Sequence, residues 1–102
     1  MSEQKCTDLP SGWGSERWIV AGRVQGVGFR YHALLSAHRL GIFGDVRNHP
    51  DGRVEVRAQG PTDRLAGFLA SVRSGPPGAR VDSVESSELQ HGMRFDTFTI
   101  RH

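Results

Sequence analysis

Hydrophobic and polar residues alternate along three segments of the chain, a pattern typical of strands whose two faces meet different surroundings. These segments are residues 18–24, 42–48 and 53–59. Weaker alternation predicts two further strands over residues 80–89 and 95–101. The sequence therefore predicts five strands.

Two segments between these strands have the apolar spacing of helices. Residues 29–40 carry an apolar stripe, and Gly41 follows as a helix stop. The second helix is predicted to open with Pro61 at its first position, to carry Asp63 near the positive end of its dipole, and to end at residues 75–78. Its apolar residues follow the spacing i, i+3, i+4, i+7: Leu65, Phe68, Leu69 and Val72.

The predicted element order is β-α-β-β-α-β with a short extra strand at the C-terminus. Two helices can cover only one face of such a sheet. We therefore expect an α+β fold, a ferredoxin-like two-layer sandwich in which an antiparallel sheet carries both helices on one face. The 102 residues suffice for one domain. This fold supports many functions, so function has to come from the site.

The first fifteen residues differ in composition from the rest of the chain. They are polar and are interrupted by Pro10, Gly12 and Gly14. We predict a flexible leader over residues 1–15 and a domain over residues 16–102. The single cysteine, Cys6, has no intrachain disulfide partner and is expected to be an exposed tail residue.

The chain carries no sign of a membrane or secretory address. It has no apolar signal region at its start and no apolar run near the ~20 residues that a membrane span requires. We expect a cytoplasmic protein without a membrane partner.

The charge balance gives little support for nucleic-acid binding. Lys+Arg number 13 and Asp+Glu number 11, for a formal net charge of +2. A nucleic-acid binder usually concentrates its basic residues on one face, whereas acids punctuate the arginines here. RNA binding on the sheet would also need stacking aromatics on the central strands, and residues 53–57 have none. No nucleic-acid partner is expected.

The most informative stretch is the glycine-rich turn that precedes the first helix. A helix N-terminus offers unpaired N–H groups and partial positive charge, which together bind anions. Arg30, in the first helical turn, could close over the same spot with a bidentate fork. Alternatively, the turn merely needs glycine and Arg30 is solvated; the residues alone leave both interpretations open. The candidate anion-binding loop comprises Gly22, Arg23, Val24, Gln25, Gly26, Val27 and Gly28.

Asn48 stands where the second strand meets its turn. It is either a turn residue that bonds its own backbone or an amide that orients water. The five histidines show no metal-ligand spacing, so no metal site and no cofactor are predicted; His49 is expected to be an exposed turn residue.

Residues 22–30, GRVQGVGFR, resemble the signature of the acylphosphatase family, small enzymes that hydrolyse acyl phosphates. A second family motif is similar to Gly44-x-Val46-x-Asn48-x-x-x-Gly52-x-Val54, followed by Gln59-Gly60, and the resemblance ends with Phe98-x-Ile100. It covers residues 18–102.

The resemblance implies a mechanism as well as the ferredoxin-like fold. Backbone N–H groups of the loop would hold the phosphate, Arg30 would be the phosphate-binding arginine, and Asn48 would position water. The family needs no metal. The expected partners are an acyl phosphate substrate and inorganic phosphate as product and inhibitor, and the protein is expected to be a monomer.

Two residues depart from the family pattern. Asp45 stands where the family usually has an aromatic residue; it either sits near the phosphate and weakens binding or pairs with Arg47 on the same strand face. The chain ends in His102 where many relatives end in tyrosine, which leaves the role of the terminal aromatic open.

A non-catalytic function is the remaining alternative. A regulatory anion-binding module of this fold resembles the leading domain of large hydrogenase-maturation carbamoyltransferases. We expect no further domain in a chain of 102 residues, and this expectation disfavours the alternative. We expect an enzyme, a metal-independent acylphosphatase.

Overall fold

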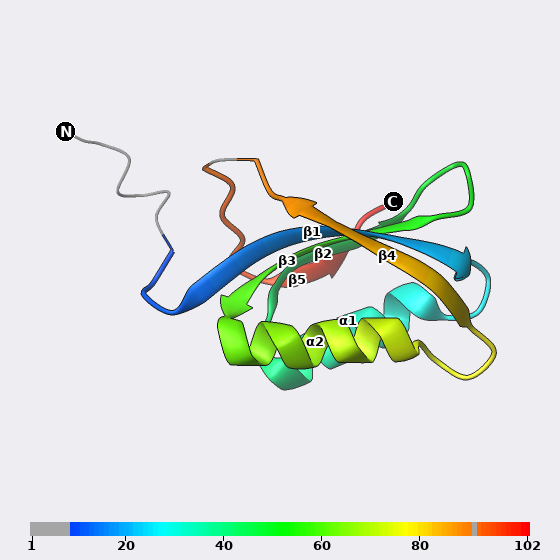
Figure 1. The fold of residues 1–102 in the computed structure, drawn as a ribbon, viewed down its shortest axis with the longest axis horizontal. Coiled ribbons are helices and arrows are strands. Elements are labelled where there is room, and N and C mark those ends of the chain that lie inside the picture. The colour runs from blue at the N-terminus through cyan, green and yellow to red at the C-terminus, as the bar shows by residue number, and fades with distance from the viewer. Residues whose placement is uncertain (1–8, 91) are drawn as a thin grey trace.

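The computed structural model describes residues 9–90 and 92–102. Two helices lie against one face of a five-stranded sheet (Figure 1). This confirms the predicted two-layer α+β sandwich. In chain order the elements are β1 (Trp13–Arg23), α1 (Phe29–Leu40), β2 (Phe43–Asn48), β3 (Val54–Pro61), α2 (Thr62–Ser74), β4 (Arg80–Glu88) and β5 (Phe98–Ile100).

The sheet is mixed, whereas an antiparallel sheet was expected. The strand order is β4-β1-β3-β2-β5; β2 and β5 run parallel, and the other neighbours are antiparallel. The backbone N–H of Arg101 donates to the carbonyl of Val46 at 2.8 Å along the parallel edge. The expectation was wrong because β5 runs opposite to β4 and lies at the other edge of the sheet. There β5 arrives with the direction of β2.

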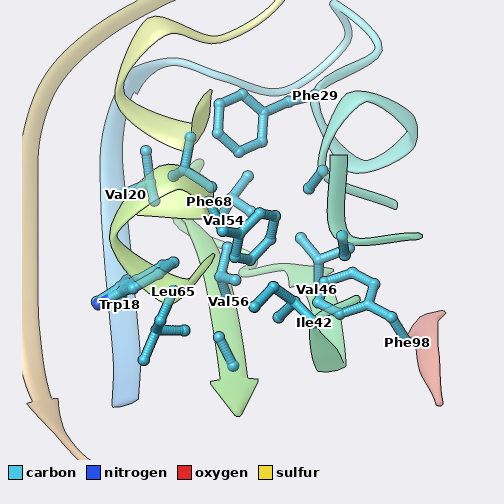
Figure 2. Close-up of a cluster of buried hydrophobic side chains, with 14 of the residues drawn as sticks. Trp18, Val20, Phe29, Ile42, Val46, Val54, Val56, Leu65, Phe68 and Phe98 are labelled. Atoms are coloured by element: carbon cyan, nitrogen blue, oxygen red, sulfur yellow. The ribbon is translucent and has the colours of Figure 1, made fainter. Parts of the chain in front are cut away.

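One apolar core fills the space between the sheet and the helices (Figure 2). The ring of Phe68, from α2, lies 5.6 Å from the rings of Trp18 and Phe98. Fully burying a side chain of this kind contributes about 1.5–3 kcal/mol. Phe29 from the first turn of α1 is buried in the same core, which fixes the start of that helix against the sheet.

The predicted helical stripes are confirmed by burial. The buried members are Phe29, Ala33, Ala37, Leu65, Phe68 and Val72, with Leu40 and Leu69 packed against them. No helix in the described part of the chain is long and apolar enough to cross a membrane.

The first strand begins at Trp13, five residues before its predicted start. Trp13 pairs with Pro61 of β3, and its ring stacks on Phe43 with 5.6 Å between centroids. Residues 13–15, predicted to belong to the leader, therefore lie in the sheet. The glycines on either side of Trp13 suggested a break, but pairing with β3 outweighs that local preference. Cys6 lies outside the described residues.

The boundaries of two other elements also differ from the prediction. Pro61 is the N-cap of α2 rather than its first helical residue: its φ of −54° and ψ of 138° keep it extended, in register with Trp13. The last strand is limited to Phe98–Ile100, because only these residues pair with β2.

Candidate active site

A cavity of about 240 Å³ opens at the end of the sheet where β1 leads into α1. Its walls come from the loop between these elements, the first turn of α1, the end of β2 and the C-terminal residues. Arg30 and Asn48, 18 positions apart in the chain, both line it. The two residues predicted to carry the chemistry are thus brought to one cavity.

The loop owes its shape to two glycines in the left-handed region. Gly26 has a φ of 75° and Gly28, the N-cap of α1, has a φ of 80°. The first helical hydrogen bond runs from the N–H of His32 to the carbonyl of Gly28 at 3.0 Å, so the N–H groups that precede His32 in the first turn have no helical acceptor. That turn carries no acidic residue. The positive end of the dipole therefore remains available to an anion.

The structure divides the predicted phosphate loop into two parts. Val24, Gln25, Gly26 and Gly28 line the cavity, and Val27 packs against the core. Gly22 and Arg23 lie in β1 and pair with β4.

Gly22 has a packing role of its own. A Cβ atom there would stand 2.1 Å from the carbonyl oxygen of Arg80, so glycine is needed for the close approach of β4.

The Arg30 guanidinium forms no ion pair with a carboxylate of the described residues. Arg30 is the second residue of α1 and is half-buried on the cavity wall. It takes part in none of the ion pairs formed among the described residues. An unpaired arginine fork beside a helix N-terminus is suited to bind a phosphoryl group through two hydrogen bonds.

Asn48 ends β2 on the side of the sheet that faces the helices, two residues after the buried Val46. Its Oδ1 atom is buried and has no hydrogen-bond partner among the described residues. An unsatisfied buried acceptor costs about 1–3 kcal/mol, so water or a ligand is expected to satisfy it. The alternative of a turn residue whose Oδ1 bonds its own backbone finds no support in this geometry.

Gln25 ties the two halves of the cavity together. Its Nε2 donates to the carbonyl of His49 at 2.7 Å and to that of Arg53 at 2.9 Å. These two bonds fasten the loop that precedes α1 to the turn that follows Asn48. The sequence placed Gln25 in the loop but gave no sign of this side-chain role.

The ring of His49 is held on the other face of the sheet. Its Nε2 lies 2.9 Å from Oε1 of Glu55, and only 15% of its side chain is exposed. The expectation of an exposed turn residue was therefore wrong, because the hydrogen bond to Glu55 holds the ring against β3.

Glu55 accepts hydrogen bonds from three side chains, and the four residues form a cluster on this face of the sheet. Burial raises the pKa of its carboxyl, but hydrogen bonds from His49, Arg17 and Arg47 outweigh that effect and lower the pKa to about 2. The carboxylate is charged at neutral pH and holds its three donors in place. The sequence could have suggested this cluster only through the strand register, which pairs Arg47 with Glu55.

Asp45 lies on the face of the sheet away from the helices, outside the cavity lining. Its carboxylate binds the guanidinium of Arg57 through two hydrogen bonds of 2.8 and 2.5 Å. Of the two alternatives for Asp45, the pair with Arg47 is wrong, because the register puts Arg57 directly opposite Asp45 while Arg47 pairs with Glu55. The strand thus directs Asp45 away from Asn48, and its carboxylate does not line the cavity.

The C-terminal His102 lines the cavity together with Ile100. Parallel pairing of β5 with β2 brings this end of the chain beside Asn48. Among the described residues no group of three or more His, Cys, Asp or Glu side chains could hold a metal ion.

Comparison with known proteins decides the family. A sequence model described as Acylphosphatase matches residues 16–100. The chain belongs to the acylphosphatase family. An acylphosphatase of Nitrobacter hamburgensis is 54% identical over 71 residues, which cover 70% of this chain and 72% of that protein.

Solved acylphosphatases share the fold. The crystal structure of the Bacillus subtilis acylphosphatase superposes with a TM-score of 0.82 at 39% identity, covering 86% of this chain and 98% of that one. The structure of an acylphosphatase from Coxiella burnetii gives a TM-score of 0.82 at 31% identity, covering 88% and 94%.

These findings confirm the predicted family, the ferredoxin-like fold and the expectation of an enzyme. The chain is an acylphosphatase, a hydrolase of acyl phosphates. The catalytic roles of Arg30 and Asn48 remain predictions.

Proposed function

We propose that this acylphosphatase hydrolyses the carboxyl–phosphate bond by direct attack of water on a phosphoryl group held by residues 24–28 and Arg30, without a metal ion. One observation carries the proposal. The guanidinium of Arg30 and the buried amide oxygen of Asn48 line the same cavity, and neither has a partner in the part of the chain that the structure describes.

Arg30 and the loop supply the positive charge that phosphoryl transfer requires. Charge develops on the equatorial phosphoryl oxygens in the transition state, and fixed donors stabilise it most effectively when they are already in place. The N–H groups at the start of α1 are fixed by the positive φ angles of Gly26 and Gly28. We infer that this preorganisation, rather than acid or base catalysis, supplies most of the acceleration.

Asn48 is proposed to hold the attacking water. Its free Oδ1 accepts a hydrogen bond from the water and orients the oxygen lone pair toward phosphorus. A new bond forms between this oxygen and phosphorus as the bond to the acyl oxygen breaks. The proton of the water passes to a phosphoryl oxygen of the substrate, so no side chain has to act as the base.

The leaving group needs no acid either. It departs as a carboxylate whose conjugate acid has a pKa near ~4, so it is stable without protonation at neutral pH. The products are the carboxylate and inorganic phosphate. Phosphate occupies the same donors as the substrate and is therefore proposed as a competitive inhibitor.

The proposal is tested with acetyl phosphate in the presence of excess EDTA, against a phosphate monoester as control substrate. We expect full turnover of the acyl phosphate and little of the monoester. Loss of activity in EDTA with recovery on addition of Mg²⁺ would contradict the metal-free mechanism.

Variants separate the two proposed roles. Arg30→Gln should lower kcat/KM and abolish inhibition by phosphate, and Arg30→Lys should rescue little because a point charge does not reproduce the fork. Asn48→Ala should lower kcat by about 10²-fold while phosphate still inhibits, as when one preorganised polar group is removed. Arg39→Gln, at the exposed last turn of α1, is the matched control.

We further propose that the protein acts as a cytoplasmic monomer. All proposed donors and the proposed water-orienting group come from one chain, which supports a site complete in the monomer. Size-exclusion chromatography with light scattering tests the oligomeric state.

A further inference from the structure

We propose that Gln25 is a positioning residue for hydrolysis: its side chain holds the turn after β2 against the loop before α1 and thereby places Asn48 correctly relative to the bound phosphoryl group. The inference rests on the proposed function, because Asn48 must orient the attacking water. It adds a side chain that acts through Asn48 rather than on the water itself.

The side chain of Asn48 is not held in place by hydrogen bonds of its own. It makes none to any other residue that the structure describes. Its position is therefore set by the backbone at the end of β2, where Asn48 pairs with Val54 of β3. Directly beyond this pair the chain forms the turn of residues 49–53, which is closed by a hydrogen bond of 2.8 Å from the N–H of His49 to the carbonyl of Arg53.

Gln25 spans this closing pair of the turn from the wall of the cavity. Its Nε2 donates to the carbonyl of His49 at 2.7 Å and to the carbonyl of Arg53 at 2.9 Å. Each carbonyl also accepts a backbone hydrogen bond within the turn, and a carbonyl oxygen has lone pairs for two donors. Two acceptors require the NH₂ group of the amide, so these partners fix the orientation of the Gln25 side chain.

The two hydrogen bonds of Gln25 form the polar link between the loop and the turn. No other hydrogen bond or ion pair of the described chain joins residues 24–28 to residues 48–53. The pairing of β1 with β3 ends at Val20 and Val54, before the loop begins. The loop and the turn lie at the same end of the sheet (Figure 1), and Gln25 sets the separation between them.

This separation affects the rate of reaction and not the binding of phosphate. The proposed phosphoryl donors come from one continuous stretch, residues 24–30, whose shape depends on the positive φ angles of Gly26 and Gly28 and on the start of α1. Loss of the Gln25 side chain leaves these donors in place but changes the position of Asn48 relative to them. A misplacement of about 1 Å can cost about 10²-fold in rate.

Gln25→Met tests the inference, because methionine keeps the length of the side chain and removes both donors. We expect kcat for acetyl phosphate to fall about ten- to a hundredfold, with an unchanged inhibition constant for inorganic phosphate. Gln25→Ala should show the same split between kcat and phosphate inhibition, which excludes an effect of the methionine side chain itself.

Gln59→Met is the matched control. Gln59 also donates from Nε2 to a backbone carbonyl at 2.7 Å, that of Met93, but it is 1% exposed and lies outside the cavity lining. Its replacement should lower the free energy of unfolding at least as much as Gln25→Met and leave kcat unchanged under conditions where both variants are folded. An equal fall in kcat in Gln59→Met would show that lost stability slows the reaction, and would overturn the inference.

Combination with Asn48→Ala shows whether Gln25 acts through Asn48. Once the water-orienting amide is absent, Gln25→Met should lower kcat no further, because the effects of coupled residues are not additive. An unchanged kcat in Gln25→Met, equal fold-changes in the two backgrounds, or weaker inhibition by phosphate in Gln25→Met would overturn the inference and leave the proposed function intact. A wild-type kcat in Asn48→Ala would instead overturn the role of Asn48 in the proposed function.

Discussion

The two faces of the central sheet bury their side chains by different means. Toward the helices, β3 presents Val54 and Val56, both fully buried in the apolar core. On its other face the same strand presents Glu55 and Gln59, which are 5% and 1% exposed. No helix of the described residues covers this second face (Figure 1). Burial there comes from ion pairs and from the segment before β5, whose Met93 carbonyl accepts a hydrogen bond from Gln59.

This difference bears on the active site because two consecutive residues at its edge direct their side chains to opposite faces of the sheet. Asn48 lies on the helix-covered face and His49 on the polar face. The carbonyl of His49 accepts a hydrogen bond from Gln25, while its ring is held by Glu55. The position of Asn48 therefore depends both on apolar packing and on a buried, charged hydrogen-bond network.

The largest effect is expected on the apolar face. Phe68→Ala removes the ring that contacts Trp18 and Phe98 and leaves a cavity at the centre of the core. We expect a loss of about 3–5 kcal/mol in the free energy of unfolding, measured by urea denaturation. A loss below about 1 kcal/mol would mean that the core collapses around the missing ring, contrary to the close packing of protein interiors.

Glu55→Gln should produce the next largest effect, now on the polar face. The substitution keeps the shape of the side chain but removes the charge that satisfies Arg17, Arg47 and His49. We expect a loss of about 1–3 kcal/mol at pH 7, as for other buried hydrogen bonds to charged groups.

The pH dependence of this loss identifies its cause. The pKa of Glu55 is lowered in the folded protein to about 2, from its ordinary value of 4.5. Its stabilisation is therefore complete above the unfolded pKa and declines as pH falls from about 4.5 toward 2. The difference in unfolding free energy between wild type and Glu55→Gln should shrink over that interval. A difference independent of pH would indicate that packing, not charge, holds the cluster.

Asp45→Asn tests whether the polar face is separate from the cavity. The Asp45 carboxylate is 7% exposed and is bound by Arg57, so the variant should lose about 1–2 kcal/mol of stability. KM for the acyl phosphate should stay unchanged, because Asp45 lies outside the cavity lining. A lower KM in this variant would show that its charge reaches the phosphate.

The start of β1 extends the polar face with an aromatic pair. A chain that begins at residue 13 retains the stack of Trp13 on Phe43 and the hydrogen bond from Gln59 to Ser15, whereas a chain that begins at Glu16 loses both. We expect the shorter chain to be less stable by about 1–2 kcal/mol, since Trp13 is only half-buried. Equal urea midpoints for the two chains would show that residues 13–15 are dispensable.

Features that depend on neighbouring residues could be predicted from the sequence, whereas features that depend on contacts between distant residues could not. The shape of the loop could be predicted because Gly26 and Gly28 set their own backbone conformation and α1 begins directly after them. The apolar face could be predicted because its periodicity is local. Both features depend on residues that lie close together in the sequence.

The polar face could not be predicted in the same way. The pair of Asp45 with Arg57 depends on the register between β2 and β3, and the burial of Gln59 depends on a segment more than thirty residues further along the chain. The hydrogen bond from Gln25 to the carbonyl of His49 forms only when the loop before α1 and the turn after β2 lie side by side in the folded protein. Such contacts follow from the folded topology, which a single sequence does not display.

The smallest effect on stability is expected for an exposed arginine–aspartate pair, Arg80 with Asp82, which has the same chemistry as the buried pair of Arg57 with Asp45. Arg80 donates to both carboxylate oxygens of Asp82, at 2.9 and 3.3 Å, much as Arg57 does to Asp45. The side chains of the exposed pair are 69% and 53% accessible, because β4 lies at the edge of the sheet.

The hydrogen bond from Arg80 lowers the pKa of Asp82, yet water competes for both charges, and exposed ion pairs of this kind contribute little to stability. Asp82→Asn should therefore leave the urea midpoint unchanged at low and high salt. Asp45→Asn should lower that midpoint under both conditions, because burial protects its pair from screening. Equal losses of stability in Asp82→Asn and Asp45→Asn would contradict this prediction. The hydrogen-bond geometry of the pair would then determine its contribution to stability, and burial on the polar face would add nothing.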